Sequence, residues 1–191
     1  MSHVIEEFTA QVPVWRPYLR PVVLEEATPA QRDALKETPS NTKVSDYVLV
    51  LAHDPETLSV RTPLFNRIMY DRGGLSRAER ELGAVGSSIV NRCIYCAAVH
   101  ADRYNQLTRD ESAMQAVFAA GADADLEPRA RAILQFAAGL AQCPPEADTA
   151  PLRAAGLDDA EMVDLVLSTA LFGWANRLMH TLGEPVAKDA P

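Results

Sequence analysis

Long apolar runs are missing from this 191-residue sequence. A helix that spans a membrane needs about 18 or more consecutive apolar residues, and no segment approaches that length. The first residues, Met1 to Glu7, also have no basic stretch followed by an apolar one, so no secretory signal is visible. We therefore expect a cytoplasmic protein with no membrane partner, in a compartment where thiols stay reduced.

Basic residues are scarce as well. Lysine and arginine number 18 against 26 aspartate and glutamate residues, which gives a net charge of −8. A nucleic-acid backbone needs a positive surface, so we expect no nucleic-acid partner. The acidic balance favours solubility, and the length suits one domain with a sizeable core.

Cysteine is rare, with three residues, and this small odd number is not that of a disulfide-stapled scaffold. Cys143, which precedes Pro144-Pro145, has no evident partner and is expected to be a partly buried thiol near the end of a helix. The other two cysteines, Cys93 and Cys96, lie close together. In a reducing compartment such a pair is catalytic or metal-binding more often than structural.

Alternating strand patterns are absent, and the sequence predicts an all-α, multihelical fold. Five prolines interrupt residues 1–43, which are expected to form an irregular N-terminal arm with a short helix over 29–36. A helical domain is expected over 44–186 and a C-terminal tail over 187–191. Capping residues and apolar spacing predict helices over 45–52, 54–72, 76–90, from 91 through the cysteine pair, 110–118, 128–140 and 158–182.

Two of these helices begin alike. Gly74 to Glu79 and Gly156 to Glu161 agree at four of six positions, and each segment opens a long helix. This echo suggests a degenerate internal repeat in which only the first copy has the thiols. In the helix that follows Asp54, the residues expected to be buried are Leu58, Leu64, Ile68 and Met69.

Cys93-Ile94-Tyr95-Cys96 is followed four residues later by His100. On a helix, Cys96 lies about 60° and His100 about 20° from the direction of Cys93, so the three side chains share a face. Thiols at this spacing can close a disulfide within one turn, and the spacing often goes with raised thiol acidity. If Asn91 caps this helix, Cys93 lies in its first turn, where the helix dipole favours a thiolate.

These residues, with Leu75 to Glu81 upstream, resemble the core of the AhpD-like alkyl hydroperoxidases of the carboxymuconolactone decarboxylase superfamily. The family pattern places a Glu twelve residues before the first Cys of a Cys-x-x-Cys and a His four residues after the second. Glu81, Cys93, Cys96 and His100 meet every term of this pattern. The matching core covers about residues 75–106, and a looser helical resemblance extends over 45–183.

The resemblance implies a homo-oligomer, a trimer or hexamer, that reduces hydrogen peroxide or organic hydroperoxides without a cofactor or metal. It implies that Cys96 attacks the peroxide, Cys93 resolves the sulfenic acid as a disulfide, and Glu81 and His100 relay the proton. An external dithiol or a disulfide reductase would restore the pair. Better-studied members often have His where this chain has Tyr95, and a phenol with a pKa near ~10 cannot act as a base at neutral pH.

The residues themselves leave the attacking sulfur open, because a helix start favours Cys93 as the thiolate whereas the family assigns Cys96. They also set a geometric condition. In one straight helix Glu81 would lie ~18 Å from Cys93 along the axis, so Glu81 can serve the site only if the chain turns. We therefore predict a helix break between residues 88 and 92.

Other interpretations use the same residues. The protein could be a thiol–disulfide oxidoreductase, a decarboxylase-like or ligand-binding member of the superfamily, or a structural assembly module in which the Cys pair is incidental. The decarboxylase branch does not depend on a Cys pair, which argues against that interpretation. A zinc site would need a fourth ligand, and His53 and His180 lack supporting spacing.

Overall fold

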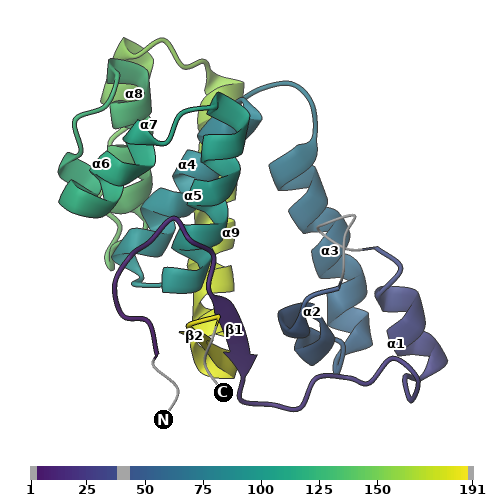
Figure 1. The fold of residues 1–191 in the computed structure, drawn as a ribbon. Helices are drawn as coiled ribbons and strands as arrows, with labels where there is room; N and C mark the ends of the chain where they lie inside the picture. Colours follow the sequence, from purple (N-terminus) through teal and green to yellow (C-terminus); the bar gives the residue numbers. More distant parts are fainter. Residues whose placement is uncertain (1–3, 38–43, 189–191) are drawn as a thin grey trace.

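The computed structural model describes residues 4–37 and 44–188. The predicted arm and tail therefore lie partly outside the described residues, at 1–3, 38–43 and 189–191. The chain forms a helical bundle in which α4 (Arg77–Val90) packs against α5 (Ile94–Thr108), α7 (Pro128–Leu140) and α9 (Asp159–Leu182) (Figure 1). The predicted all-α class is confirmed, and α4 is the central helix on which the site is built.

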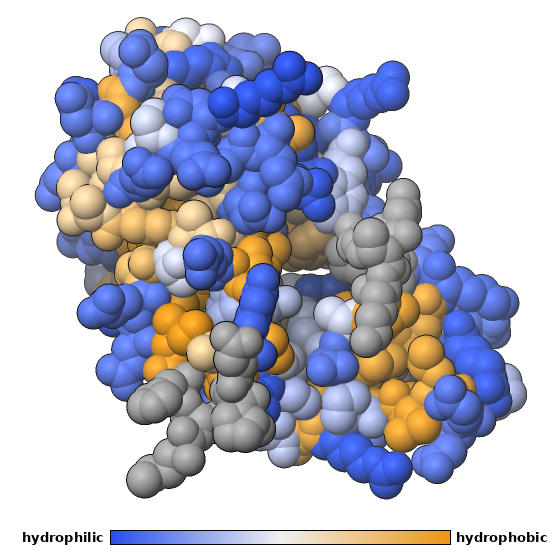
Figure 2. Space-filling view, viewed as in Figure 1, coloured by the Kyte–Doolittle hydropathy of each residue, from blue (hydrophilic) through white to orange (hydrophobic). Residues whose placement is uncertain are grey.

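Shorter elements surround this bundle. α6 (Ser112–Ala120), a 3₁₀ turn η1 (Gly121–Asp123) and α8 (Ala150–Ala154) cover the side near α7, and the last two were not predicted. α1 (Pro29–Ala34), α2 (Asp46–Leu51) and α3 (Pro55–Tyr70) form a separate group beside the bundle (Figure 1). In the space-filling view of Figure 2 a recess lies between this group and the bundle.

A two-stranded sheet corrects the expectation that no strand is present. β1 (Val14–Pro17) pairs antiparallel with β2 (Gly183–Val186), with Val14 opposite Val186. Each strand has four residues, too few for an alternating pattern to be visible in the sequence. The pairing depends on Trp15, which is buried and lies so close to Gly183 that a Cβ there would be 2.4 Å from the indole ring. The sheet fixes the N-terminal arm to the end of α9.

The predicted helix starts are confirmed where side chains cap them. Ser45, Asp54, Ser76 and Asp158 each accept a hydrogen bond from the backbone N–H three residues later. In α3 the prediction of buried residues was partly wrong. Leu58 and Met69 are buried, but Leu64 is 51 % exposed and Ile68 is half-buried, because Arg61 and Phe65 occupy the inner face instead.

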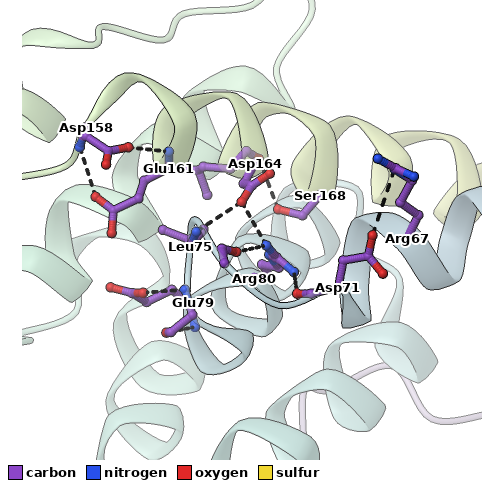
Figure 3. Close-up of polar contacts among 12 residues, drawn as sticks. Arg67, Asp71, Leu75, Glu79, Arg80, Asp158, Glu161, Asp164 and Ser168 are labelled. Atoms are coloured by element: carbon purple, nitrogen blue, oxygen red, sulfur yellow. Dashed lines mark hydrogen bonds and ion pairs between the residues drawn. The ribbon is translucent and has the colours of Figure 1, made fainter.

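The two similar helix starts meet in space. Ser76 with Glu79, and Asp158 with Glu161, form capping boxes, and Arg129 donates to both glutamates at 2.6 Å. Figure 3 shows this region, with the two capping glutamates near each other. The two similar sequence segments therefore form the same local structure, a helix start with a capping box.

An ion pair between a buried arginine and a partly buried aspartate joins the same two helices. Arg80 donates to Asp164 at 2.8 Å, and the backbone N–H of Leu75 donates to the same carboxylate oxygen at 3.0 Å (Figure 3). Arg80 also bonds the carbonyl oxygens of Asp71 and Gly73, so it holds the chain that enters α4. In the part of the chain that the structure describes, no helix combines the length and the apolar character that crossing a membrane requires.

Candidate active site

A turn between α4 and α5 brings the distant site residues together. α4 ends at Val90, Arg92 has a left-handed φ of 55°, and α5 begins at Ile94, which confirms the predicted break. Asn91 was expected to cap α5, but it ends α4, and Cys93 is the N-cap residue of α5. The Cys93 N–H donates to the Ser88 carbonyl at 2.9 Å, which closes the turn. α5 therefore folds back along α4.

The turn places Glu81 against His100, nineteen residues later. A Glu81 carboxylate oxygen is hydrogen-bonded to His100 Nδ1, and the side chain of Glu81 is fully buried. The other oxygen accepts from Arg77 Nε at 2.6 Å. Burial alone would raise the pKa of Glu81, but the adjacent His100 and Arg77 outweigh it and lower the pKa of this carboxyl. Glu81 is thus a buried carboxylate held in its charged form.

Aromatic rings fix the orientation of both partners. The Phe172 ring lies 4.2 Å from the His100 ring, centroid to centroid, with an interplanar angle of 71°. The Arg77 guanidinium lies 3.9 Å from the centroid of Tyr70. Packing against rings restricts rotation of the imidazole and the guanidinium. We call Glu81 and His100 the Glu81 dyad. Packing against these rings therefore holds the dyad in a fixed orientation.

Cys93 and Cys96 are both buried, and both are free thiols. A hydrogen bond from the Cys96 thiol lowers the pKa of Cys93, and the backbone N–H of Cys96 and the Asn176 side chain add to this effect. The same hydrogen bond, together with burial, raises the pKa of Cys96. These opposite directions favour Cys93 over Cys96 as the thiol that ionises first.

Asn176 is a site residue that sequence analysis missed. Its side chain is buried where α9 meets the end of α4. There its Nδ2 donates to Ser88 Oγ at 3.1 Å, and its Oδ1 accepts from Asn91 Nδ2 at 3.2 Å. It connects α9 to the turn that holds the thiols. The available signal was its position four residues after Phe172, on the apolar face of α9, where a polar side chain needs a partner.

Each thiol lines a different cavity. Cys96 lines a cavity of about 330 Å³, here called the Cys96 pocket, together with Tyr47, Arg61, Glu81, His100 and Phe172. Cys93 lines a second cavity of about 310 Å³, the Cys93 pocket, which includes Trp15, Arg92, His180 and Glu184. Tyr95 and Met179 border both cavities. The dithiol thus lies between two spaces, and the Glu81 dyad lies in only one of them.

Tyr95 separates the two pockets as a neutral phenol. Burial raises its pKa, and the neighbouring thiols and Asp46 act in the same direction. It therefore stays protonated at neutral pH, and acts as an apolar wall with a hydroxyl group and not as a base. Arg61, a second residue that sequence analysis missed, lines the Cys96 pocket and is 5 % exposed.

The remaining candidate residues, His53, His180 and Cys143, do not form a metal site in the described part of the chain. Among residues 4–37 and 44–188, no group of three or more His, Cys, Asp and Glu side chains could hold a metal ion. His53 bonds the Arg20 carbonyl, and His180 bonds the Asn91 carbonyl at 2.9 Å. Cys143 follows the end of α7 as predicted, but it is exposed and not partly buried, because no element covers the loop that contains it.

Comparison with known proteins agrees with this geometry. The model of the carboxymuconolactone decarboxylase family matches residues 55–139. No curated protein matches significantly. The fold is similar to a solved structure from Ralstonia eutropha JMP134, described as an alkylhydroperoxidase AhpD core and uncharacterised peroxidase-related protein. That likeness has a TM-score of 0.75 and 28% identity, and covers 93% of this chain and 94% of that one.

Two further structures extend the likeness. An uncharacterised peroxidase-related protein from Silicibacter sp. TM1040 has a TM-score of 0.70 and 26% identity, over 87% of this chain and 91% of that one. The debrominase Bmp8 has a TM-score of 0.72 at 17% identity, over 87% and 90%, and therefore shares the fold alone. The family-model match and these structural likenesses together support an AhpD-like fold within the carboxymuconolactone decarboxylase superfamily.

Proposed function

We propose that this protein is a dithiol peroxidase that reduces hydrogen peroxide or an organic hydroperoxide through Cys93 and Cys96. The observation that carries the proposal is that Cys96 and the Glu81 dyad line one cavity, with Cys93 hydrogen-bonded to Cys96. Peroxide reduction needs a thiolate, a proton for the leaving alkoxide and a second thiol, and this arrangement supplies all three. The description of the Ralstonia eutropha relative supports the same reaction class.

The first step uses the hydrogen bond between the thiols. Cys93 thiolate takes the proton of Cys96 along that bond, and Cys96 becomes the attacking thiolate. Its sulfur bonds to the distal peroxide oxygen, the O–O bond breaks, and the leaving alkoxide takes a proton from His100 Nε2, which gives an alcohol. The peroxide is reduced and Cys96 is oxidised to a sulfenic acid. Glu81 stabilises the protonated imidazole before the transfer.

The second step protects the oxidised sulfur. Cys93 thiol attacks the sulfenic acid of Cys96, a disulfide forms, and water leaves. The two sulfurs lie one helical turn apart, so this step needs little movement. An external dithiol then attacks the disulfide sulfur of Cys93 through the Cys93 pocket and releases Cys96 thiolate. The partner's second thiol completes the exchange and leaves both cysteines reduced.

A second candidate function is thiol–disulfide exchange with little peroxidase activity. It is favoured by the lowered pKa of Cys93 and by the separate pocket that Cys93 lines. In that case the oxidant is a disulfide and the Glu81 dyad takes no part in oxidation. The two candidates separate by which oxidant reacts faster with the reduced pair.

The test is a titration of the reduced protein with cumene hydroperoxide, followed by mass spectrometry of the cysteine states. A Cys93–Cys96 disulfide at stoichiometric peroxide is expected, with Cys143 unchanged. In Cys93→Ser, a sulfenic acid trapped on Cys96 would identify the attacking sulfur. Thiols that survive excess peroxide but exchange with a disulfide reagent would replace the peroxidase proposal with the exchange function.

A further inference from the structure

Arg61 is a buried cation whose hydrogen bonds are largely unmade. It lies on the inner face of α3 between Leu58 and Phe65, and it is 5 % exposed. Among the described residues, its Nε and Nη1 atoms have no hydrogen-bond partner, and Nη2 donates only a long bond of 3.4 Å to the Tyr47 hydroxyl. A buried guanidinium in this state is desolvated without compensation, which folding alone does not favour.

Aromatic rings surround the guanidinium, and no carboxylate pairs with it in the described part of the chain. The Arg61 Cζ atom lies 5.4 Å from the Tyr47 ring centroid, 5.3 Å from that of Phe65 and 5.7 Å from that of Trp174. These cation–π contacts hold the side chain in place but use none of its N–H groups. The Nε and Nη1 donors therefore have no partner among the described residues, and Arg61 lines the Cys96 pocket.

The Cys96 pocket has the charge that such a ligand would need. Among the described residues, three arginines line it, namely Arg61, Arg77 and Arg103. They stand against one carboxylate, Glu81, which already pairs with Arg77 and His100. This positive excess occurs on a chain with a net charge of −8. A positively charged pocket attracts and concentrates negatively charged ligands, even on a molecule whose net charge is negative.

We propose that Arg61 binds a carboxylate of the substrate, so that the preferred substrate is an organic hydroperoxide that also has a carboxylate group. This inference rests on the peroxidase function proposed above. A guanidinium edge, either Nε with Nη2 or Nη1 with Nη2, matches a carboxylate, which accepts two parallel hydrogen bonds; on each edge of Arg61 one atom is unpaired, and Nη2 makes only the long bond to Tyr47. The rest of the cavity includes Phe65, Val99 and Phe172, and its volume of about 330 Å³ suits a small apolar body.

Binding in this way orients the reaction. The carboxylate lies at Arg61, the apolar body contacts the aromatic wall, and the hydroperoxide lies between Cys96 and His100. The distal oxygen is transferred to the Cys96 sulfur, the proximal oxygen leaves as an alcohol with a proton from His100, and the carboxylate is unchanged. The product is a hydroxy acid, and Arg61 acts by positioning its precursor.

The test compares two substrates that differ only in charge: the para-carboxylate of cumene hydroperoxide and its methyl ester. Stopped-flow measurement follows disulfide formation in pre-reduced protein over a range of substrate concentrations. For the wild type, the second-order rate constant for the acid is expected to exceed that for the ester by about tenfold or more. Arg61→Met is expected to bring this ratio close to one. Arg61→Lys is expected to give an intermediate ratio, because lysine keeps the positive charge but cannot donate two parallel hydrogen bonds to one carboxylate.

Arg67→Met is the matched control, because Arg67 lies on the same helix with an exposed side chain. It is expected to keep the wild-type ratio, and thermal melting of each variant reports whether it folds. Equal rates for acid and ester in the wild type would overturn the carboxylate assignment while leaving the peroxidase function intact. If no hydroperoxide reacts at all, the peroxidase function fails and the assignment of a peroxide substrate fails with it.

A binding measurement tests the anion site without chemistry. Calorimetry with 4-isopropylbenzoate, which lacks the peroxide, is expected to detect binding to the wild type that Arg61→Met loses and Arg67→Met keeps. Its methyl ester is expected to bind more weakly to the wild type than the acid does. Equal binding of acid and ester to the wild type would overturn the carboxylate site directly.

Discussion

In the proposed mechanism the proton transfer depends on Glu81, which is fully buried and bonded to both Arg77 and His100. We expect Glu81→Gln to slow disulfide formation by cumene hydroperoxide about 100-fold, since the variant no longer stabilises a charged imidazole. Stopped-flow fluorescence with pre-reduced protein measures this rate. Glu79→Gln is the control: Glu79 belongs to the capping box and to the Arg129 bridge, and its loss should leave the rate unchanged. Equal rates for Glu81→Gln and wild type would remove Glu81 from the mechanism.

Cys93 should be the more acidic thiol of the pair in the resting protein. The hydrogen bond from Cys96 lowers its pKa, so the thiolate of Cys93 persists at pH values below the ordinary cysteine pKa of about 8.5. Alkylation by iodoacetamide, followed by mass spectrometry between about pH 5 and 9, should therefore reach half its maximal rate below that value. Cys96→Ala removes the donor and should move the midpoint of Cys93 upward. Preferential alkylation of Cys96 in the wild type would contradict this order.

The elements that support these residues depend on close contact between helices. Gly86 in α4 lies so near α7 that a Cβ would be 2.7 Å from the Ala137 Cβ and 3.3 Å from the Leu134 carbonyl. Gly83, one turn earlier, approaches Leu165 of α9 in the same way. Since α4 positions Glu81, glycine at these sites lets the bundle close around the dyad.

A pair of glycine substitutions tests this contact. Gly86→Ala should destabilise the protein by about 1–3 kcal/mol despite the better helix propensity of alanine, because backbone and methyl atoms must move apart. Gly173→Ala in α9 meets only the flexible end of Arg177, at 3.7 Å, and should be neutral or stabilising by up to about 1 kcal/mol. Urea unfolding of both variants measures the difference. A Gly86→Ala protein as stable as the wild type would mean that the α4–α7 contact is looser than described.

The molecule as a whole exposes apolar side chains along two neighbouring helices. On α9, Val163, Leu167 and Trp174 share one face, and on α3, Val60 and Leu64 are exposed. Exposed apolar side chains grouped on neighbouring helices are typical of an interaction site. The expectation of a homo-oligomer, a trimer or hexamer, stays a prediction, and these helices are the surface that we assign to it.

Self-association can be measured directly. Light scattering coupled to size-exclusion chromatography should give a mass that is a multiple of the 20.8 kDa chain. Leu167→Glu should shift the mass toward that of one chain, because a charge in an apolar interface is desolvated without a partner. Leu107→Glu, an exposed residue on α5, is the control and should leave the mass unchanged. A wild type that elutes as a single chain at micromolar concentration would refute the prediction.

The sequence by itself determined the local features of this protein. Side-chain caps such as Ser76 and Asp158 act on backbone groups three residues away, so the helix starts could be predicted from neighbouring residues. The spacing of Glu81, Cys93, Cys96 and His100 also implied the turn that the structure contains, because a straight helix cannot bring the first residue to the last. One exception was local too: Asn91 was expected to cap α5, but it ends α4, and Cys93 takes the N-cap position of α5 after the left-handed residue Arg92.

Only the tertiary structure determined where the Cys93 pocket and the Cys96 pocket lie relative to the two thiols. The Cys93 pocket needs the pairing of β1 with β2, and the Cys96 pocket needs α3 beside α9. Asn176 and Arg61 became site residues through contacts with chain segments about 85 and 14 residues away, which no local pattern specifies. The physical reason is that a buried polar group takes its role from the partners that packing brings to it, and packing is a property of the whole chain.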